Sequence, residues 1–357
     1  MGRAIELAEG GRYTVAPNPL VGAVLVRGGR LVGQGFHRFA GGPHAEAAAL
    51  AEAGSRARGA TLYVSLEPCA HHGRTPPCAD AILVAGVARV VAAGRDPHPL
   101  VQGRGLRRLA REGVRTVWSG AEERRRAERQ NEKFRGFVSL GRPFVLAKWA
   151  STLDGKTASA TGESRWITGR AARRRSLALR EEYDAILVGA GTVLADDPRL
   201  TRRLGWSGRL PHRRIVLDGR LRVSATARVF ARPESALVVT ALPERNARAR
   251  RLASAGISVW SLPGRAAGSV DLALLLRRLA GEGVTSLLVE GGARTHWEFF
   301  RARLVDRVAA FVAPRVLGGG GPGGAGGDGF PLARAPRVTD LEWEAVGEDL
   351  FWTGRVS

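Results

Sequence analysis

The chain has 357 residues and a mass of 38.0 kDa, more than one hydrophobic core usually serves, so two domains are expected. Hydrophobic residues make up 44% of the chain and charged residues 25%, which excludes disordered, collagenous and coiled-coil classes. No apolar run reaches the roughly 18 residues of a membrane span, and residues 1–12 lack the apolar stretch of a secretory signal, so a cytoplasmic protein without a membrane partner is expected.

The net charge of +22 is a common reason to suspect nucleic-acid binding. Of the 55 basic residues, however, only Lys133, Lys148 and Lys156 are lysines, and the arginines are scattered through both halves. An excess of arginine spread in this way indicates a compositional bias. We therefore expect no specific nucleic-acid partner.

In the first half, apolar runs alternate between strand and helix patterns. Strands are predicted at 22–26, 31–36, 61–66, 89–93 and 114–118, and helices at 1–12, 44–53, 78–85, 103–112 and 122–139. The alternation predicts an α/β domain built around a central sheet. Gly141-Arg142-Pro143 ends the last helix with turn residues, which predicts domains at 1–142 and 143–357.

The second half begins the alternation again, without an internal repeat of the first. Strands are predicted at 144–149, 185–189, 214–217, 237–240, 258–262, 286–290 and 308–312, and helices at 170–182, 244–255 and 271–280. Residues 318–329 include nine glycines. This composition predicts a flexible loop, either a surface connection or a flap beside a ligand.

The two cysteines lie in one segment downstream of His44-Ala45-Glu46. One imidazole and the thiolates of Cys69 and Cys78 leave the fourth tetrahedral position of a zinc ion open for water, as catalytic zinc requires. Zinc lowers the pKa of such a water from about 15.7 to about 7. His44 and Cys78 each open a predicted helix, whose N-terminus favours anionic ligands. Glu46 lies about 200° round the helix from His44, which suits proton transfer better than metal ligation.

His-x-Glu followed by Pro-Cys and a second Cys is the signature of zinc deaminases. A single Cys or His is more often a packed core residue than a ligand. Here the four residues His44, Glu46, Cys69 and Cys78 occur in the signature's order on the expected elements, which packing alone does not explain. Eight residues separate the cysteines, whereas the commoner form has two.

Two segments of the second half offer small residues after a strand. The segment Gly189-Ala190-Gly191-Thr192 does not match the dinucleotide-binding pattern G-x-G-x-x-G, because Leu194 occupies the position of the third glycine. Small residues there and at Val289-Glu290-Gly291-Gly292-Ala293 would still let a cofactor phosphate approach backbone amides. Residues 146–156 run from a strand into a polar turn, where ligand-binding groups gather. For Lys148, Asp154 and Lys156, a catalytic role and a role in shaping the turn both remain open.

The first-half motifs resemble the bifunctional deaminase/reductase family of riboflavin biosynthesis. The matching stretches are Pro17-Asn18-Pro19-Leu20-Val21-Gly22, Gly33-Gln34-Gly35-Phe36-His37, His44-Ala45-Glu46, residues 67–80, residues 96–101 and Gly103-Arg104-Gly105. The resemblance implies a cytidine-deaminase-like three-layer fold with one Zn²⁺ per chain, held by His44, Cys69 and Cys78, and Glu46 as the proton carrier. It also implies a hydrogen bond from Asn18 to the pyrimidine, although a turn residue between two prolines is an equal reading of Asn18.

The second half resembles the reductase half of the same family, through residues 148–156, 162–168, 191–201 and 289–292. The resemblance implies a dihydrofolate-reductase-like α/β domain that uses NADPH. The implied cofactor contacts are Ala150, Trp166, Thr192, Asp196, Gly219, Gly292, Ala293, Arg294, Thr295, His296, Trp297 and Glu298. The implied substrate contacts are Ser164, Arg180, Leu200, Arg203 and Glu290. Gly219 stands where the resemblance would place a serine.

The resemblance predicts two reactions on a small phosphoribosyl-pyrimidine substrate. The first is zinc-dependent deamination of 2,5-diamino-6-ribosylamino-4(3H)-pyrimidinone 5′-phosphate, and the second is NADPH-dependent reduction of the ribosyl side chain to ribityl. A homo-oligomer is expected. The alternative is an RNA or nucleoside zinc deaminase with a non-reductase second domain. A non-catalytic nucleic-acid-binding protein would give no reason for the zinc residues to occur together.

Overall fold

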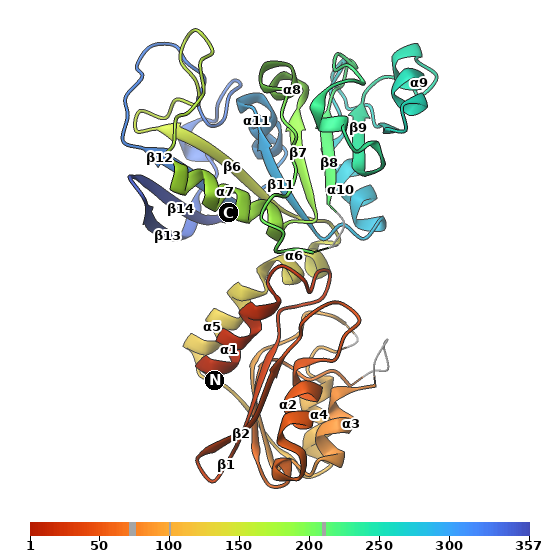
Figure 1. Cartoon of the computed structure of the whole chain (residues 1–357), viewed down its shortest axis with the longest axis vertical. Coiled ribbons are helices and arrows are strands. Elements are labelled where there is room, and N and C mark those ends of the chain that lie inside the picture. The colour runs from red at the N-terminus through yellow and green to blue at the C-terminus, as the bar shows by residue number, and fades with distance from the viewer. Residues whose placement is uncertain (71–75, 100, 209–211) are drawn as a thin grey trace. The chain divides into compact units, whose positions relative to one another are not determined.

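The computed structural model describes residues 1–70, 76–99, 101–208 and 212–357. It divides into two compact units, Met1–Arg142 with Trp206–Gly208, and Pro143–Gly205 with Arg209–Ser357. Each unit is built on its own sheet (Figure 1). No helix among the described residues is long and apolar enough to cross a membrane.

The first unit has a five-stranded sheet in the order β2-β1-β3-β4-β5. β1 pairs antiparallel with β2 and β3, whereas β3, β4 and β5 are parallel. The strands are β1 Gly22–Arg27, β2 Arg30–Phe36, β3 Thr61–Leu66, β4 Arg89–Gly94 and β5 Arg115–Trp118. The helices are α1 Gly2–Ala8, α2 Ala45–Ala53, α3 Cys78–Val84, α4 Arg104–Arg111, α5 Ala121–Gln130 and α6 Glu132–Leu140, with 3-10 turns at Glu9–Gly11 and Gly54–Ala57.

Helices cover both faces of this sheet, which gives three layers (Figure 1). α2, α3 and α4 share one apolar cluster with the sheet, and α1 and α5 pack on the other face through Ile5 and Ala127. Glycines bring α2 close to β2: a Cβ at Gly35 would lie 2.9 Å from the carbonyl oxygen of Ala45, the first residue of α2. This close approach fixes the position of the α2 N-terminus, which carries His44.

The helix predicted at 122–139 is two helices, so that expectation was wrong. The chain breaks at Asn131, whose buried side chain accepts a hydrogen bond from the Leu20 amide and donates one to the Leu20 carbonyl, both at 2.8 Å. The tertiary contact outweighs helix periodicity at this point. The helix predicted at 1–12 is likewise shorter, because α1 ends at Ala8 and a 3-10 turn follows.

The second unit has a nine-stranded sheet in the order β10-β9-β8-β7-β11-β6-β12-β14-β13. The seven strands from β10 to β12 are parallel, and β14 and β13 add an antiparallel edge. The strands are β6 Phe144–Thr152, β7 Ala185–Gly189, β8 Arg213–Leu217, β9 Ala236–Thr240, β10 Ser258–Ser261, β11 Ser286–Gly291, β12 Arg307–Ala313, β13 Val338–Val346 and β14 Asp349–Val356.

Helices and apolar clusters lie on both faces of this larger sheet. The helices are α7 Arg170–Glu182, α8 Ala190–Asp196, α9 Ala247–Ser254, α10 Leu272–Gly281 and α11 Ala293–Arg301, with 3-10 turns at Arg228–Phe230, Pro233–Ser235 and Leu332–Arg334. The pattern did not predict α8, α11, β13 or β14. α9 begins later than expected, at the residue after Asn246, because the Asn246 side chain caps it. The carboxyl ends of β6, β7, β8 and β11 share one edge, which is where parallel sheets bind ligands.

Candidate active sites

The three predicted zinc ligands come together in the first unit. His44 caps α2, Cys78 is the first residue of α3, and Cys69 lies in the segment after β3. The amide of Cys78 donates a hydrogen bond to the Cys69 sulfur at 3.3 Å, and the amide of Ala79 donates to the Cys69 carbonyl at 3.1 Å. The start of α3 therefore holds one ligand and orients the other.

The spacing of the three ligand atoms fits a zinc ion. His44 Nδ1 lies 3.1 Å from Cys78 Sγ and 3.7 Å from Cys69 Sγ, and the three atoms lie within 4.8 Å of one another. Zinc–sulfur and zinc–nitrogen bonds of about 2.3 and 2.0 Å in a tetrahedron separate ligand atoms by roughly 3.5–3.8 Å. One imidazole and two thiolates form a donor set typical of zinc, with one position left for water.

The two sulfurs titrate as a pair. Hydrogen bonds from the Cys78 thiol and His44 lower the pKa of Cys69 to about 4. The hydrogen bond to Cys69, together with burial, raises the pKa of Cys78. Cys69 is thus the more readily deprotonated of the two, and a bound metal would require both sulfurs as thiolates.

Glu46 is a buried carboxyl in the first turn of α2. Burial, followed by the charge of Cys69, raises the pKa of Glu46 to about 7. A carboxyl with this pKa can both accept and donate a proton near neutral pH, as a proton carrier must.

Asn18 lies beside a histidine that the sequence pattern did not single out. Asn18 Nδ2 is 2.9 Å from His37 Nε2, and His37 Nδ1 is 2.9 Å from the carbonyl oxygen of Pro43. Because a carbonyl only accepts, we assign the proton of His37 to Nδ1, and Nε2 then accepts from the Asn18 amide. The His37 ring also contacts the His44 ring edge-on, with centroids 5.4 Å apart. His37 thus connects Asn18 to the ligand cluster. Residues 71–75 of the first-half motif, and Leu100, lie outside the described residues.

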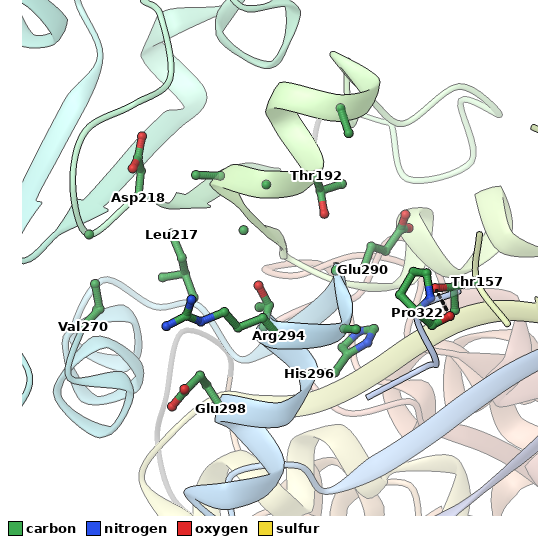
Figure 2. Close-up of a pocket in the computed structure, with 18 of the residues that line it drawn as sticks. Thr157, Thr192, Leu217, Asp218, Val270, Glu290, Arg294, His296, Glu298 and Pro322 are labelled. Atoms are coloured by element: carbon green, nitrogen blue, oxygen red, sulfur yellow. Dashed lines mark hydrogen bonds between the residues drawn. The ribbon is translucent and has the colours of Figure 1, made fainter. Parts of the chain in front are cut away.

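A cavity of about 810 Å³ opens at the carboxyl edge of the second sheet (Figure 2). It brings together most of the residues that the resemblance assigned to cofactor and substrate. Those that line it are Ala150, Ser164, Thr192, Asp196, Gly219, Glu290, Gly292, Ala293, Arg294, Thr295, His296 and Glu298.

Five assigned residues do not line this cavity. Trp166 is 63% exposed with the Arg173 guanidinium over its ring, and Trp297 is buried against Phe330. The remaining three are Arg180, which pairs with Glu290, Leu200, which lies in the core, and Arg203, whose amide donates to Glu181.

Two residues that line the cavity, Lys148 and Glu290, form a buried ion triad with Arg180. Arg180 donates two hydrogen bonds to the Glu290 carboxylate, at 2.8 and 2.7 Å, and Lys148 Nζ lies 3.5 Å from the same group. Burial alone would raise the pKa of Glu290, but Arg180 and Lys148 outweigh it and lower the pKa to about 2. Burial lowers the pKa of Lys148, against the attraction of Glu290. The triad therefore places a carboxylate beside an amine whose pKa is lowered by burial, and both groups line the cavity.

Small residues let two helix starts approach each other above the sheet. A Cβ at Gly189 would lie 2.3 Å from Thr295 Oγ1, and one at Gly292 would lie 3.0 Å from Thr192 Oγ1. Gly191, which also lines the cavity, has no atom within 4 Å of its Cβ position. The space and backbone amides at this point suit the phosphates of a dinucleotide.

Asp154 anchors the glycine-rich segment beside the cavity. Its carboxylate accepts hydrogen bonds from the amides of Leu317, at 3.2 Å, and Gly318, at 2.7 Å, and from Thr152 Oγ1. These bonds, chiefly the one from Thr152, lower the pKa of Asp154 to about 2. The backbones of Lys156 and Gly323 pair in an isolated antiparallel β-bridge. Of the two roles left open for Asp154, the contacts support shaping the turn, and Pro322 and Gly324 of the same segment line the cavity.

Comparisons with known proteins cover both units. The RibD C-terminal domain family model matches residues 143–352, and the cytidine and deoxycytidylate deaminase zinc-binding region matches residues 1–94. The chain is 42% identical to riboflavin biosynthesis protein RibD of Aquifex aeolicus, over 97% of this chain and 95% of the relative. It is 41% identical to RibD of Escherichia coli, over 98% and 96%.

Solved structures agree. Acinetobacter baumannii RibD, form 1, has a TM-score of 0.87 and 37% identity over 100% of this chain and 97% of its own. The Thermotoga maritima diaminohydroxyphosphoribosylaminopyrimidine deaminase/5-amino-6-(5-phosphoribosylamino)uracil reductase has a TM-score of 0.84 and 36% identity over the same shares. The predicted deaminase-like and reductase-like folds are confirmed, and the RibD match of the second half contradicts the alternative of a non-reductase domain. The chain belongs to the RibD family, the bifunctional deaminase/reductases of riboflavin biosynthesis that combine a zinc-binding deaminase half with an NADPH-dependent reductase half.

Proposed function

We propose that this chain deaminates 2,5-diamino-6-ribosylamino-4(3H)-pyrimidinone 5′-phosphate in residues 1–142 and reduces the ribosyl side chain of the product in residues 143–357. The observation that supports the proposal is that one chain holds both a cluster of zinc-ligand side chains and a cavity large enough for a cofactor. The His-Cys-Cys cluster adjoins the buried carboxyl of Glu46, and the cavity is lined by Lys148 and Glu290, two members of a buried ion triad.

In the deamination, Zn²⁺ when bound supplies a water that is acidic enough to attack at neutral pH. Glu46 accepts one proton from the attacking water and passes it to the ring nitrogen, and it then carries the hydroxyl proton to the amino group, which leaves as ammonia while the ring carbon becomes a carbonyl. Burial raises the pKa of this carboxyl, which favours its return of the proton after it has accepted one. The Asn18 amide, oriented by His37, leaves its oxygen to accept a hydrogen bond from the pyrimidine.

In the reduction, NADPH when bound supplies the hydride that adds to C1 of the opened ribosyl chain. Hydride addition to the C1=N bond of the opened chain needs a proton on the nitrogen, and Lys148 Nζ, which lines the cavity beside Glu290, is the proposed donor. Glu290, fixed by Arg180, orients Lys148 and the substrate hydroxyls. Ser164, Leu200 and Arg203 remain proposed contacts to the phosphoribosyl group.

The proposal is tested by mixing purified protein, Zn²⁺, the diaminopyrimidine substrate and NADPH, and following ammonia release and NADPH oxidation separately. We expect both from the wild-type chain. Glu46→Gln should retain zinc and lose about 10²–10⁴-fold in deamination, while it still reduces the deaminated pyrimidine supplied directly. Absence of both signals from the wild-type chain, or undiminished deamination by Glu46→Gln, would contradict the proposal.

We also propose a cytoplasmic location and a homo-oligomeric state. Both cysteines are free and lie in the ligand cluster, and such thiols persist in reducing compartments. The edge strand β13 is exposed almost throughout, with Trp343 at 74%, and an unpaired edge of this kind can be covered by a second copy. Light scattering of the purified protein tests the oligomeric state, and a monomer at micromolar concentration would contradict it.

A further inference from the structure

One motif of the first half has no role so far. Residues 96–101 and Gly103-Arg104-Gly105 belong to the family resemblance, and they lead into α4. Gly103 directly precedes α4 and has a φ of +80°, in the left-handed region that favours glycine. Figure 1 shows α4 with α2 and α3 in the first unit, and the three helices share one apolar cluster. The motif therefore adds a third helix to the layer that carries His44 and Cys78.

Cys69 is the zinc ligand whose position depends most on contacts with other segments. His44 directly precedes α2 and Cys78 begins α3, whereas Cys69 lies after β3, outside any helix or strand. The start of α3 holds its carbonyl oxygen and its sulfur from the downstream side. The place of the sulfur therefore also depends on what holds the two residues before it.

Glu67 connects the segment before Cys69 to the start of α4. Its amide donates a hydrogen bond to the Gly94 carbonyl at 2.9 Å, and its Oε2 accepts one from the Gly103 amide at 2.8 Å. The residue is 4% exposed, and Oε1 has no hydrogen-bond partner among the described residues. A carboxylate at this point also interacts favourably with the positive end of the helix. Loss of the side chain would therefore release the start of α4 from the segment that carries Cys69.

Gly105 brings the first turn of α4 against the backbone of the same segment. A Cβ at Gly105 would lie 1.8 Å from the carbonyl oxygen of Pro68, so no side chain fits unless the helix or the segment moves. The start of α4 therefore contacts both residues that precede Cys69, Glu67 through a hydrogen bond and Pro68 by packing. Cys69 is thus held from one side by α3 and from the other by α4.

We propose that Glu67 and Gly105 are positioning residues for the zinc site, which fix Cys69 at its ligand position by fastening the start of α4 to Glu67-Pro68. The inference rests on the ligand set of the proposed deaminase half and is independent of the reductase half. Groups that orient a metal ligand typically change metal affinity about 10–100-fold. Glu67 acts here through the backbone of Cys69, whereas Glu46 acts on the transferred protons.

A purely structural role for Glu67 is the competing interpretation. A carboxylate that accepts a hydrogen bond at the start of a helix stabilises a fold wherever it stands. In that case Glu67→Ala would lower the stability of the first unit, while the folded protein would bind zinc as tightly as wild type and with the same ligand geometry. Zinc affinity and ligand geometry, measured on folded protein, therefore separate the two interpretations.

The experiment measures the zinc affinity of the full-length protein by competition with a chelator, and the visible absorption of the Co²⁺-loaded protein. The absorption of Co²⁺ depends on its thiolate ligands and their geometry, so it reports on Cys69 without any turnover. The variants are Glu67→Ala, Glu67→Gln and Gly105→Ala. Arg108→Ala is the matched control, because Arg108 lies on the same helix and forms a part-exposed ion pair with Asp80.

We expect Glu67→Ala and Gly105→Ala to bind zinc about 10–100-fold more weakly than wild type, with an altered Co²⁺ spectrum. Glu67→Gln keeps an oxygen that can accept the Gly103 hydrogen bond, so it should bind zinc within about threefold of wild type. The control should stay within about twofold, because a part-exposed ion pair contributes little.

Wild-type zinc affinity and a wild-type Co²⁺ spectrum in Glu67→Ala would overturn the inference. Equal losses in Glu67→Ala and the Arg108→Ala control would also overturn it, as would a failure of Glu67→Gln to restore affinity. If Glu67→Ala fails to fold, as judged by circular dichroism, Glu67→Asp replaces it: the shorter side chain withdraws the oxygen from Gly103 and must weaken zinc binding in the same way. Wild-type protein that binds no zinc would refute the ligand set and this inference together, whereas zinc binding without deamination would refute the proposed function alone.

Discussion

Glu290→Gln is the most informative single substitution in the reductase half. Gln keeps the shape of the side chain but removes the charge that lies between Arg180 and Lys148. The substitution leaves two buried cations without their counter-ion. It should therefore destabilise the second unit as well as impair reduction.

The size of the effect follows from the carboxyl's pKa. The pKa is lowered from 4.5 to about 2, which corresponds to about 3 kcal/mol of stabilisation at neutral pH. Removal of one partner of a buried ion pair typically costs about 3–5 kcal/mol, which agrees. Because the folded-state pKa is the lower one, the stabilisation is fully present above the unfolded-state value and is lost as pH falls. It should decrease from about 3 kcal/mol above pH 5 to about half that at pH 3.

Urea unfolding at pH 7, 5 and 3 measures this difference between wild type and variant. Tryptophan fluorescence reports mainly on the second unit, because only Trp118 and Trp206 belong to the first. Glu344→Gln is the matched control, since Glu344 is 57% exposed and lies 3.5 Å from Arg175. An exposed pair of this kind contributes about 0–1 kcal/mol, so the control should resemble wild type at each pH.

Two results would refute this reasoning. A difference below about 1 kcal/mol at pH 7 would mean that the triad contributes no more than an exposed pair. A difference that stays constant from pH 7 to pH 3 would mean that it does not arise from the ionised carboxylate of Glu290. A purely structural defect would produce the second result.

Three further substitutions test other contacts. Cys69→Ala should abolish zinc binding and deamination but leave NADPH affinity unchanged, as metal analysis and calorimetry would show; retention of one zinc per chain would contradict the ligand set. Asp154→Asn weakens the anchor of the glycine-rich segment and should raise KM for NADPH severalfold with little change in Tm, whereas an unaltered KM would remove the loop from cofactor binding. Asn131→Leu leaves the Leu20 amide and carbonyl unpaired and should destabilise the first unit by about 1–3 kcal/mol in urea unfolding; a change below about 0.5 kcal/mol would show that another group replaces the side chain.

The sequence predicted the zinc cluster well because its residues mark element ends. His44 and Cys78 open helices and Cys69 follows a strand, so an α/β alternation in the right order brings them to one place. The ion triad had no such signal. Arg180 and Glu290 are 110 residues apart in the sequence. Lys148 lies on β6 and Glu290 on β11, and these strands are neighbours only because of the strand order of the folded sheet.

The missed elements share physical causes. α8 has seven residues, too few for a helical period to be distinguished from the glycine-containing turn that precedes it. β13 lies at a sheet edge and has no buried face. Its alternation of Leu341 and Trp343 with acidic residues therefore does not mark a buried side of the strand. His37 was quoted within a motif, but its contact with Asn18 depends on a bend between β2 and α2 that no periodicity reveals.

The hydrogen bonds of Asn131 also limit where the chain could be truncated to give a deaminase half that folds on its own. The deaminase family match ends at residue 94, yet a chain cut there would lack β5 and expose the edge of β4 to pairing with other strands. It would also bury the Leu20 amide and carbonyl without the side chain that satisfies them. An autonomous deaminase half must therefore extend beyond β5 and α5 and include Asn131.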